Sequence, residues 1–200
     1  MIQKATRNVV SSVTAIIVIT AVFGFAYPAV MTGFAQVAFN HEANGSLISK
    51  NGKVIGSELA AQAFTKPQYF HSRPSATTPA YNAASTTFAN LGPTNPDLTK
   101  AVRQRIAAIL RLEGPYNPGL KVSDIPVDAV TTSASGIDPD ISPAYARLQA
   151  ARVAKVRGLP LSRVLQLVGQ HTDGRWLGVF GEPGVNVLEL NLALDRERSS

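Results

Sequence analysis

An uncharged stretch near the N-terminus constrains this chain more than any other feature. From Asn8 to Asn40 the sequence contains no Asp, Glu, Lys or Arg, and the part from Val9 to Phe25 is mostly apolar. A helix needs roughly 20 apolar residues to cross the hydrocarbon core of a bilayer. Backbone groups in lipid must be hydrogen-bonded within their own segment, which favours a helix. The sequence therefore predicts one transmembrane helix.

Two other structures compete with a membrane anchor. Lys4 and Arg7, followed by Gly24-Phe25-Ala26, resemble the charged region and cleavage site of a signal peptide. The apolar run from Val9 is longer than the roughly 7–15 residues usual in such peptides. A buried helix of a soluble domain normally keeps a polar face. This segment has no polar face along its length. The anchor is therefore the favoured interpretation, and Pro28 is expected to kink the helix or to end its first part.

The anchor divides the chain into three parts. We predict an N-terminal tail over residues 1–8, a transmembrane helix with its extension over 9–39, and a soluble domain over 40–200. Lys4 and Arg7 precede the span with no acidic residue beside them. The positive-inside rule then places the N-terminus in the cytoplasm and the soluble domain in the periplasm or another extracytoplasmic space. The chain has no cysteine, so disulfides give no information about the compartment.

The net charge is +6, from 19 basic and 13 acidic residues. A basic domain is able to bind nucleic acid, anionic lipid or an acidic protein. The basic residues here are spread along predicted helices rather than clustered, which is typical of solvated helix faces. We therefore predict no nucleic-acid partner, and binding of lipid or nucleic acid through the basic helices stays a weaker alternative.

Turn and cap signals predict a mixed α/β, or α+β, soluble domain. Asn51-Gly52 between apolar pairs predicts a β-hairpin. Capping residues followed by proline predict two helices, from Asn95 to Gly114 and from Ser142 to Gly158. We also expect a short helix over 57–64, extended pieces at 125–127 and 130–132, a helix over 162–171, strands at 176–180 and 185–192, and a charged tail over 195–200.

The second of these helices is expected to bury one face. Leu148, Ala151 and Val156 are predicted on the buried side. The polar or basic side is predicted to carry Arg147, Arg152, Lys155 and Arg157.

Familiar catalytic motifs are missing from the sequence. It contains no G-x-x-x-x-G-K-[ST] phosphate loop and no G-x-S-x-G elbow. Its histidines are far apart, without the spacing of a metal site. Ser133 or Ser135 with His171 and either Asp138 or Asp173 form a possible serine–histidine–aspartate set, although such a triad is defined by geometry. A membrane-anchored periplasmic serine hydrolase is therefore the alternative function, and otherwise no catalytic or metal site is predicted.

Three loop segments are unusually rich in Pro, Gly and polar residues. They span residues 69–76, 90–96 and 133–143. Proline and glycine fix the backbone, while Arg73, Asn90, Asn95 and Asp138 supply directional hydrogen-bonding groups. Such side chains commonly satisfy loop backbone and cap helices. The alternative is a docking face for a partner or a nucleotide, held in place by fixed loops.

In their order behind one N-terminal anchor, these segments resemble the C subunit of the Kdp potassium-transporting ATPase. The resemblance covers nearly the whole chain. It departs from the usual family pattern at Asp140, where a histidine is common, and also at Ala89 and Gly184. The pieces that carry it are Gly45-Ser46-Leu47-Ile48, Tyr69-Phe70, Arg73-Pro74-Ser75-Ala76, 90–96, 133–142, Arg152-Val153-Ala154, His171-Thr172 and 181–188.

The resemblance implies a non-catalytic accessory subunit of a high-affinity, ATP-driven potassium importer in the cell inner membrane. The implied partners are a potassium-translocating channel-like subunit, a P-type ATPase subunit and a small single-span subunit. It also implies a catalytic chaperone that raises the affinity of the ATPase subunit for ATP, with no cofactor bound firmly by this chain. The candidate residues for docking a partner or nucleotide are Arg73, Ser75, Asn90, Asn95, Ser135, Asp138, Gln170 and His171.

Overall fold

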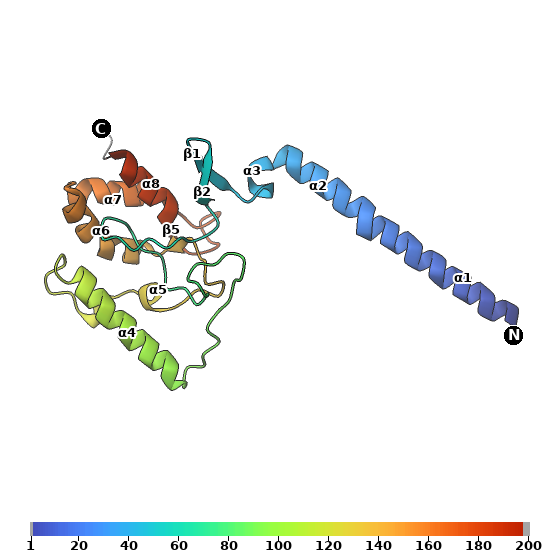
Figure 1. Cartoon of the computed structure of the whole chain (residues 1–200), viewed down its shortest axis with the longest axis horizontal. Helices are drawn as coiled ribbons and strands as arrows, with labels where there is room; N and C mark the ends of the chain where they lie inside the picture. Colours follow the sequence, from blue (N-terminus) through green and yellow to red (C-terminus); the bar gives the residue numbers. More distant parts are fainter. Residues whose placement is uncertain (1, 198–200) are drawn as a thin grey trace. The chain divides into compact units, whose positions relative to one another are not determined.

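The computed structural model describes residues 2–197. Its internal contacts divide the chain into two units, Met1–Leu47 and Ile48–Ser200, each of which is described by itself. Figure 1 shows the first unit as a long helix and the second as helices packed around short strands. The predicted class, one transmembrane helix followed by a mixed α/β domain, is confirmed.

The first unit is one long apolar helix. It consists of α1 (Ile2–Ile19), the π-helical η1 (Thr20–Ala26) and α2 (Tyr27–Ala38). The stretch Gln3–Ala38 contains a window of mean hydropathy 2.3, and none of that window is buried. The helix begins at Ile2, so the described part of the expected tail is helical.

The helix passes Pro28 without stopping. Pro28 lies in the first turn of α2, directly after the π-helical segment, and the Tyr27 N–H bonds to the Val22 carbonyl. A proline ring clashes with the carbonyl four residues before it in a regular α-helix. A wider π-helical turn relieves this kind of clash because its hydrogen bonds skip one more residue.

Hydrogen bonds between side-chain amides hold the chain at the C-terminal end of this long helix. After α2 a short turn, α3 (Asn40–Ala43), follows. Asn40 and Asn44 each donate from Nδ2 to Gln36 Oε1, at 3.0 and 3.1 Å. These bonds connect the last turn of α2 with the chain that leaves it, and so they fix the exit of the helix.

The predicted β-hairpin lies at the start of the second unit, with only Leu47 of its first strand assigned to the first unit. Strands β1 (Leu47–Lys50) and β2 (Lys53–Ser57) flank Asn51-Gly52. Both turn residues have positive φ, 53° at Asn51 and 74° at Gly52. This is the combination that a type I′ turn requires, and it explains why Asn-Gly predicted the hairpin correctly.

Helices and a small antiparallel sheet make up the rest of the unit. The helices are α4 (Pro96–Glu113), the 3₁₀ turn η2 (Val122–Asp124), α5 (Val127–Val130), α6 (Pro143–Arg157), α7 (Leu161–Gln170) and α8 (Val187–Glu197). The sheet has the order β3 (Asp140–Ile141), β5 (Gly184–Asn186), β4 (Thr172–Asp173). Its register pairs Val185 with both Ile141 and Thr172. The sheet therefore joins the start of α6, the end of α7 and the start of α8.

Helix α6 lies at the centre of the hydrophobic core. Ser142 caps it through the Tyr145 N–H, and Gly158 ends it in the left-handed conformation, both as predicted. Most of its residues are buried, because α4, α7 and β5 all contact it. The expected division is correct for Leu148, which is buried, and for Arg147 and Lys155, which are exposed, but it is wrong for three other residues. Arg152 is fully buried and the Arg157 side chain nearly so, whereas Val156 is 40% exposed.

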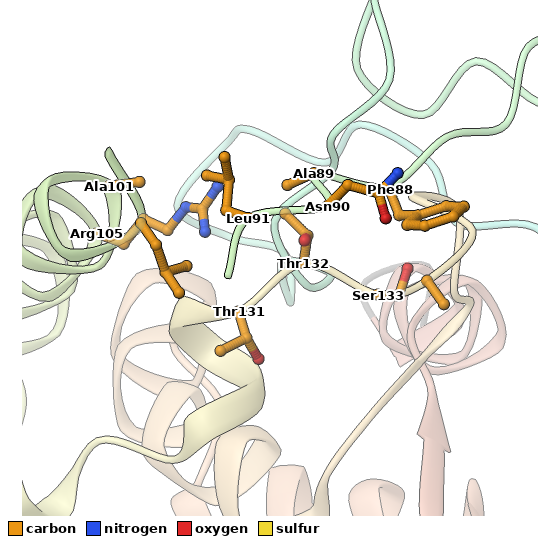
Figure 2. Close-up of a pocket in the computed structure, with 11 residues that line it drawn as sticks. Phe88, Ala89, Asn90, Leu91, Ala101, Arg105, Thr131, Thr132 and Ser133 are labelled. Atoms are coloured by element: carbon orange, nitrogen blue, oxygen red, sulfur yellow. The ribbon is translucent and has the colours of Figure 1, made fainter. Parts of the chain in front are cut away.

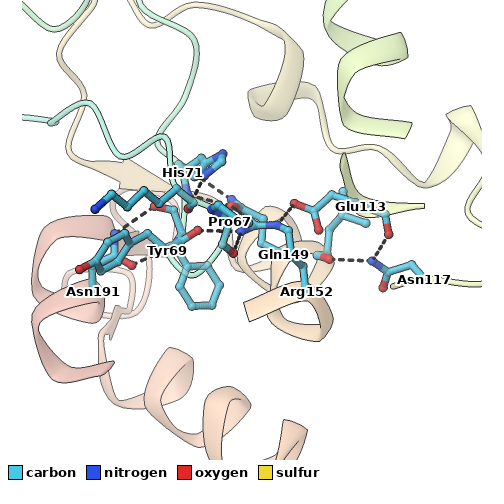
Figure 3. A network of polar contacts seen from close by, with 11 residues as sticks. Pro67, Tyr69, His71, Glu113, Asn117, Gln149, Arg152 and Asn191 are labelled. Atoms are coloured by element: carbon cyan, nitrogen blue, oxygen red, sulfur yellow. Dashed lines mark hydrogen bonds and ion pairs between the residues drawn. The ribbon is translucent and has the colours of Figure 1, made fainter. Parts of the chain in front are cut away.

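The buried Arg152 guanidinium connects three parts of the domain (Figure 3). Its Nε donates to Glu113 Oε1 of α4 at 2.8 Å, and its Nη2 donates to Gln149 Oε1 at 2.9 Å. Its Nη1 donates to the carbonyls of Tyr69, at 2.9 Å, and of Pro67. A buried charge needs partners of this kind, because it has lost its hydration. Removing one partner of a buried ion pair leaves the charge of the other uncompensated.

Two further side chains hold the same loop. Gln149 of α6 bonds both the N–H and the carbonyl of His71, at 2.8 and 3.0 Å. Asn191 of α8 does the same for Phe70, at 2.8 and 2.9 Å. The loop backbone is thereby satisfied as it would be in a strand. Phe70 is fully buried among the helices as a result.

Several sequence-based boundaries are wrong. Residues 57–64 form no helix: the Ser57 hydroxyl accepts the Leu59 N–H in a tight turn. Val127 and Val130, the inner ends of the two expected extended pieces, belong to the helix α5, and 176–180 form a turn. Gly114 follows α4 in the right-handed conformation, without the expected left-handed stop.

The strand expected over 185–192 stops at Asn186. The Asn186 side chain there accepts the Glu189 N–H at 3.1 Å, and α8 begins. Residues 195–197 of the expected tail belong to α8, and 198–200 lie outside the described residues.

Replacing Arg152 with Met should destabilise the full chain by about 3–5 kcal/mol, because Glu113 loses its buried partner and two loop carbonyls lose their donor. Arg147→Met on the exposed side of the same helix is the matched control, with a change of about 0.5 kcal/mol or less. Urea unfolding of both variants in detergent, followed by far-ultraviolet circular dichroism, measures the difference. Equal stability of the two variants would contradict the claim that the buried Arg152 stabilises the domain.

Candidate functional site

Two of the three polar loops contact each other directly, and one of them also bonds the chain at Thr87. The Ser75 hydroxyl donates to the Gly136 carbonyl at 2.6 Å, and Arg73 pairs with Asp138 at 2.9 Å. The Thr87 N–H donates to the Ser135 carbonyl at 3.1 Å. Residues 73–77, 87–91 and 131–138 thus form one surface, which we call the loop junction. Residue separations of about sixty are closed here by hydrogen bonds, so the loop junction is a fixed structure.

Hydroxyl groups organise the first of these loops. The Ser75 Oγ also accepts the N–H groups of Thr77 and Tyr81, at 3.2 and 3.0 Å. The Thr77 hydroxyl accepts the Asn82 N–H at 2.9 Å and donates to the Pro79 carbonyl at 2.8 Å. Tyr81 donates its phenolic hydroxyl to the Arg73 carbonyl at 2.9 Å, and burial raises the pKa of that phenol. All three side-chain hydroxyls therefore bond the loop backbone.

Gly136 allows the loops to approach closely. Its φ is +73°, and a Cβ atom at this position would lie 2.7 Å from the Thr87 carbonyl oxygen and 2.9 Å from Thr77 Cγ2. A side chain would therefore meet both strain and collision, since residues other than glycine rarely adopt this φ. The loop junction requires glycine at this position.

A pocket of about 340 Å³ opens beside the loop junction (Figure 2). It lies between the loop that carries Phe88, the first turns of α4 and the chain after α5. Its lining is mostly apolar, with hydroxyl groups along the floor and one guanidinium. The lining residues are Phe88, Ala89, Asn90, Leu91, Leu98, Ala101, Arg105, Thr131, Thr132, Ser133 and Ala134. Arg105 donates to the Val130 carbonyl at 2.8 Å and so connects α4 to the end of α5.

The predicted site residues separate into three groups. Arg73, Ser75, Ser135 and Asp138 belong to the loop junction, and Asn90 lines the pocket. Asn95 has the structural role of capping α4, since its Oδ1 accepts the Asp97 N–H at 2.8 Å. Gln170 and His171 lie at the end of α7 and do not line the pocket. The His171 Nδ1 is within 2.8 Å of the Leu167 carbonyl, so it carries the proton.

Sequence reasoning missed the contribution of α4 to the pocket. From the sequence, Ala101 and Arg105 received no role as pocket residues. Thr131 and Thr132 were expected only as extended chain. The available signal was Phe88, an aromatic residue in a polar loop, which is 52% exposed at the rim.

The alternative serine–histidine set does not assemble. The Ser133 Oγ accepts the Gly136 N–H at 3.0 Å, and the Ser135 Oγ accepts the Ile137 N–H at 3.2 Å. In the part of the chain that the structure describes, no hydrogen bond joins either serine to His171. Both serines hold the loop in shape, and the geometry does not support the hydrolase.

An acidic recess of about 300 Å³, lined in part by Arg73, lies between β3 and the chain before β5. Asp128 accepts the N–H and hydroxyl of Ser142, and Asp138 pairs with Arg73. Within residues 2–197, Asp140 forms no ion pair. Burial raises the pKa of the Asp140 carboxyl, and the negative charges of Asp138, Asp173 and Glu189 raise it further.

Fold and site together define a class of protein: a single-span membrane protein whose α/β domain presents a loop-built pocket. Comparison with known proteins makes this specific. Residues 9–196 match the family described as KdpC, the K⁺-transporting ATPase c chain, and the chain belongs to that family. It is thus a subunit of a potassium-transport complex.

Curated relatives align with this chain over almost their entire length. The KdpC subunit of the potassium-transporting ATPase from Koribacter versatilis is 49% identical over 189 residues, covering 94% of each chain. The corresponding subunit from Burkholderia orbicola is 54% identical over 186 residues, with 92% of this chain and 93% of the relative covered. That from Paraburkholderia phymatum is 55% identical over 179 residues, with coverage of 89% and 91%.

Asp140→Asn should change the pH dependence of stability. Because the pKa of Asp140 is raised in the folded chain, the folded state holds this proton to higher pH than the unfolded state. Stability then falls as the pH rises from the ordinary aspartate range through the raised value, and Asn removes that fall. Unfolding midpoints measured across this pH range for wild type, Asp140→Asn and Asp173→Asn give the test. Asp173→Asn should remove part of the effect, and identical pH profiles for all three chains would contradict the account.

Proposed function

We propose that this chain is a non-catalytic accessory subunit of a high-affinity, ATP-driven potassium importer, and that it docks through the pocket at the loop junction. The proposed partners are the channel-like potassium-translocating subunit, the P-type ATPase subunit and the small single-span subunit. Membership of the KdpC family supports an assembly of this kind. The observation that carries the docking site is the loop junction, where separate loops form a rigid rim around an apolar pocket.

The chemistry of the pocket favours a protein partner. Phe88, Leu91 and Ala101 offer apolar surface, while Asn90 and Thr132 place polar groups beside it. Protein interfaces typically combine a buried apolar anchor with a polar surround. A rigid rim also reduces the entropy lost on binding, because the loops are already ordered. The occupant we propose is an apolar side chain on a segment of a neighbouring subunit.

We place the chain in the cell inner membrane as a single-pass protein with the N-terminus in the cytoplasm. Lys4 and Arg7 support this orientation through the positive-inside rule. The α/β domain would then be periplasmic, away from cytoplasmic ATP. A chaperone effect on ATP affinity would have to pass through the shared complex to the ATPase subunit.

The part of α7 that carries Gln166 and Gln170, beside His171, does not fit direct binding of a nucleotide. The Gln166 Oε1 accepts a hydrogen bond from Arg163 Nη1 at 2.7 Å. His171 bonds back to its own helix. Among the described residues this segment forms no backbone cradle of the kind that binds phosphate. We therefore propose no cofactor for this chain, with ATP reaching the complex through the ATPase subunit.

A charge placed in the pocket should weaken assembly. Ala101→Glu puts a carboxylate against Phe88 and Leu91, whereas Ala107→Glu puts the same group on an exposed position of the same helix. Loss of a buried interface anchor typically costs 2 kcal/mol or more, about thirtyfold in affinity. The measurement is affinity purification of each variant in mild detergent from potassium-starved cells, with mass spectrometry of the recovered subunits.

We expect Ala101→Glu to lose the other Kdp subunits and Ala107→Glu to retain them. Circular dichroism of both variants shows whether the domain still folds. A folded Ala101→Glu chain that recovers its partners as well as wild type would remove the pocket as the docking site.

A further inference from the structure

A cluster of exposed apolar side chains protrudes between β4 and β5. Trp176, Leu177, Val179 and Phe180 are 69%, 72%, 68% and 60% exposed. We call these four residues the apolar tip. In water their exposure is unfavourable, because the free energy falls when apolar surface is removed from water. None of them lines the pocket at the loop junction or the acidic recess.

The apolar tip is a built structure. The Trp176 N–H bonds to the Phe180 carbonyl at 2.8 Å, and the Phe180 N–H bonds back to Trp176 at 3.0 Å. The two rings contact each other with centroids 5.7 Å apart. Below them Arg175 and Glu182 close the base through an ion pair at 2.7 Å. Leu177 and Gly178 both have positive φ, 52° and 77°, which gives the tight reversal at the end.

The distribution of exposure indicates the surroundings that this tip fits. A segment that docks on a protein face usually buries one side and keeps the other polar. Here four of five consecutive residues are large and apolar, the fifth is glycine, and every large side chain is more than half exposed. Such a tip suits a medium that is apolar on all sides. Tryptophan and phenylalanine are typical of membrane interfaces, where an apolar body meets a wet boundary.

The bilayer crossed by the N-terminal helix is such a medium, and the short connection to the α/β domain brings it within reach. The transmembrane helix ends at Ala38 and the second unit begins at Ile48. Ten residue steps of fully extended chain span at most about 35 Å. A domain tethered this closely meets the bilayer surface at high effective concentration. Weak insertion by one small tip is then sufficient for lasting contact.

We propose that the apolar tip inserts into the interface of the lipid bilayer on the side of the α/β domain, as a second membrane contact besides the transmembrane helix. The base of the tip is a paired Arg175 and Glu182, so contact does not require anionic lipid. Insertion holds the domain at the membrane surface. The proposal rests on the anchor and on the tip alone, and it is independent of docking at the loop junction.

The chain carries its own probe, because Trp176 is its only tryptophan. The full chain, reconstituted into phosphatidylcholine vesicles, should show blue-shifted Trp176 emission. Lipids brominated on the upper acyl chain should quench that emission, and added salt should leave the quenching unchanged. The double substitution Trp176→Phe, Phe88→Trp moves the probe to another exposed aromatic position, where bromine should not quench.

A matched pair of substitutions tests the apolar character of the tip. Val179→Glu should return Trp176 to water and abolish quenching by bromine. Val127→Glu, at a position 73% exposed elsewhere in the domain, should leave the quenching unchanged. Because both side chains are exposed, neither substitution should disturb the core.

Absence of quenching in wild type, or equal quenching with the probe at 176 and at 88, overturns the proposal. A third result also overturns it: Trp176 exposed to water in vesicles, but shielded without bromine quenching in the assembled complex. That result would assign the tip to an apolar pocket of a partner subunit.

Discussion

The α/β domain depends on one buried cation. Arg152 extends from the central helix α6 and bonds Glu113 of α4, Gln149 of its own helix and two carbonyls of the loop at 67–69. Burial raises the pKa of the Glu113 carboxyl, and the guanidinium beside it opposes that rise. The cation also lowers the pKa of His71, after the larger effect of burial. Side chains from α6 and α8 thus give the loop backbone the partners that a sheet would otherwise supply.

This anchoring determines where the candidate site forms. The loop fixed by Arg152, Gln149 and Asn191 leads directly to Arg73 and Ser75, which bond the segment around Gly136. That segment in turn binds the chain before Phe88, and the pocket opens between this chain and α4. A continuous series of hydrogen bonds therefore connects the core with the surface. A partner subunit therefore meets a surface that is already shaped.

The sequence predicted correctly those elements whose conformation is determined by neighbouring residues in the chain. The uncharged N-terminal run, the Asn-Gly turn and the proline-led helix starts at Asn95 and Ser142 each depend on neighbours in the sequence. Arg152 could not be placed from the sequence, because a basic residue on a helix is normally solvated and its burial here depends on Glu113 and on loop carbonyls far along the chain. The segment from Val187 fits both a strand and a helix by its apolar pattern, and the Asn186 cap decides for the helix.

The candidate site shows the same division. The sequence identified the polar loops and suggested a docking face, and most of the chosen residues lie at the loop junction or its pocket. It predicted Asn95 both as a helix cap and as a docking residue, and the hydrogen bonds show the capping role. It did not show that α4 contributes Ala101 and Arg105 to the pocket. Those facts depend on how α4 packs beside α5, where Arg105 reaches the Val130 carbonyl.

The central claim is that the pocket at the loop junction contacts another subunit of the potassium-transport complex. Site-specific photo-crosslinking in the intact membrane complex tests it most directly, with benzoylphenylalanine at Leu91 in the pocket and at Ala107 outside it. The account predicts that light joins the position 91 chain to the channel-like or the ATPase subunit, and that position 107 gives little product. Crosslinks from position 107 with none from position 91 would contradict it.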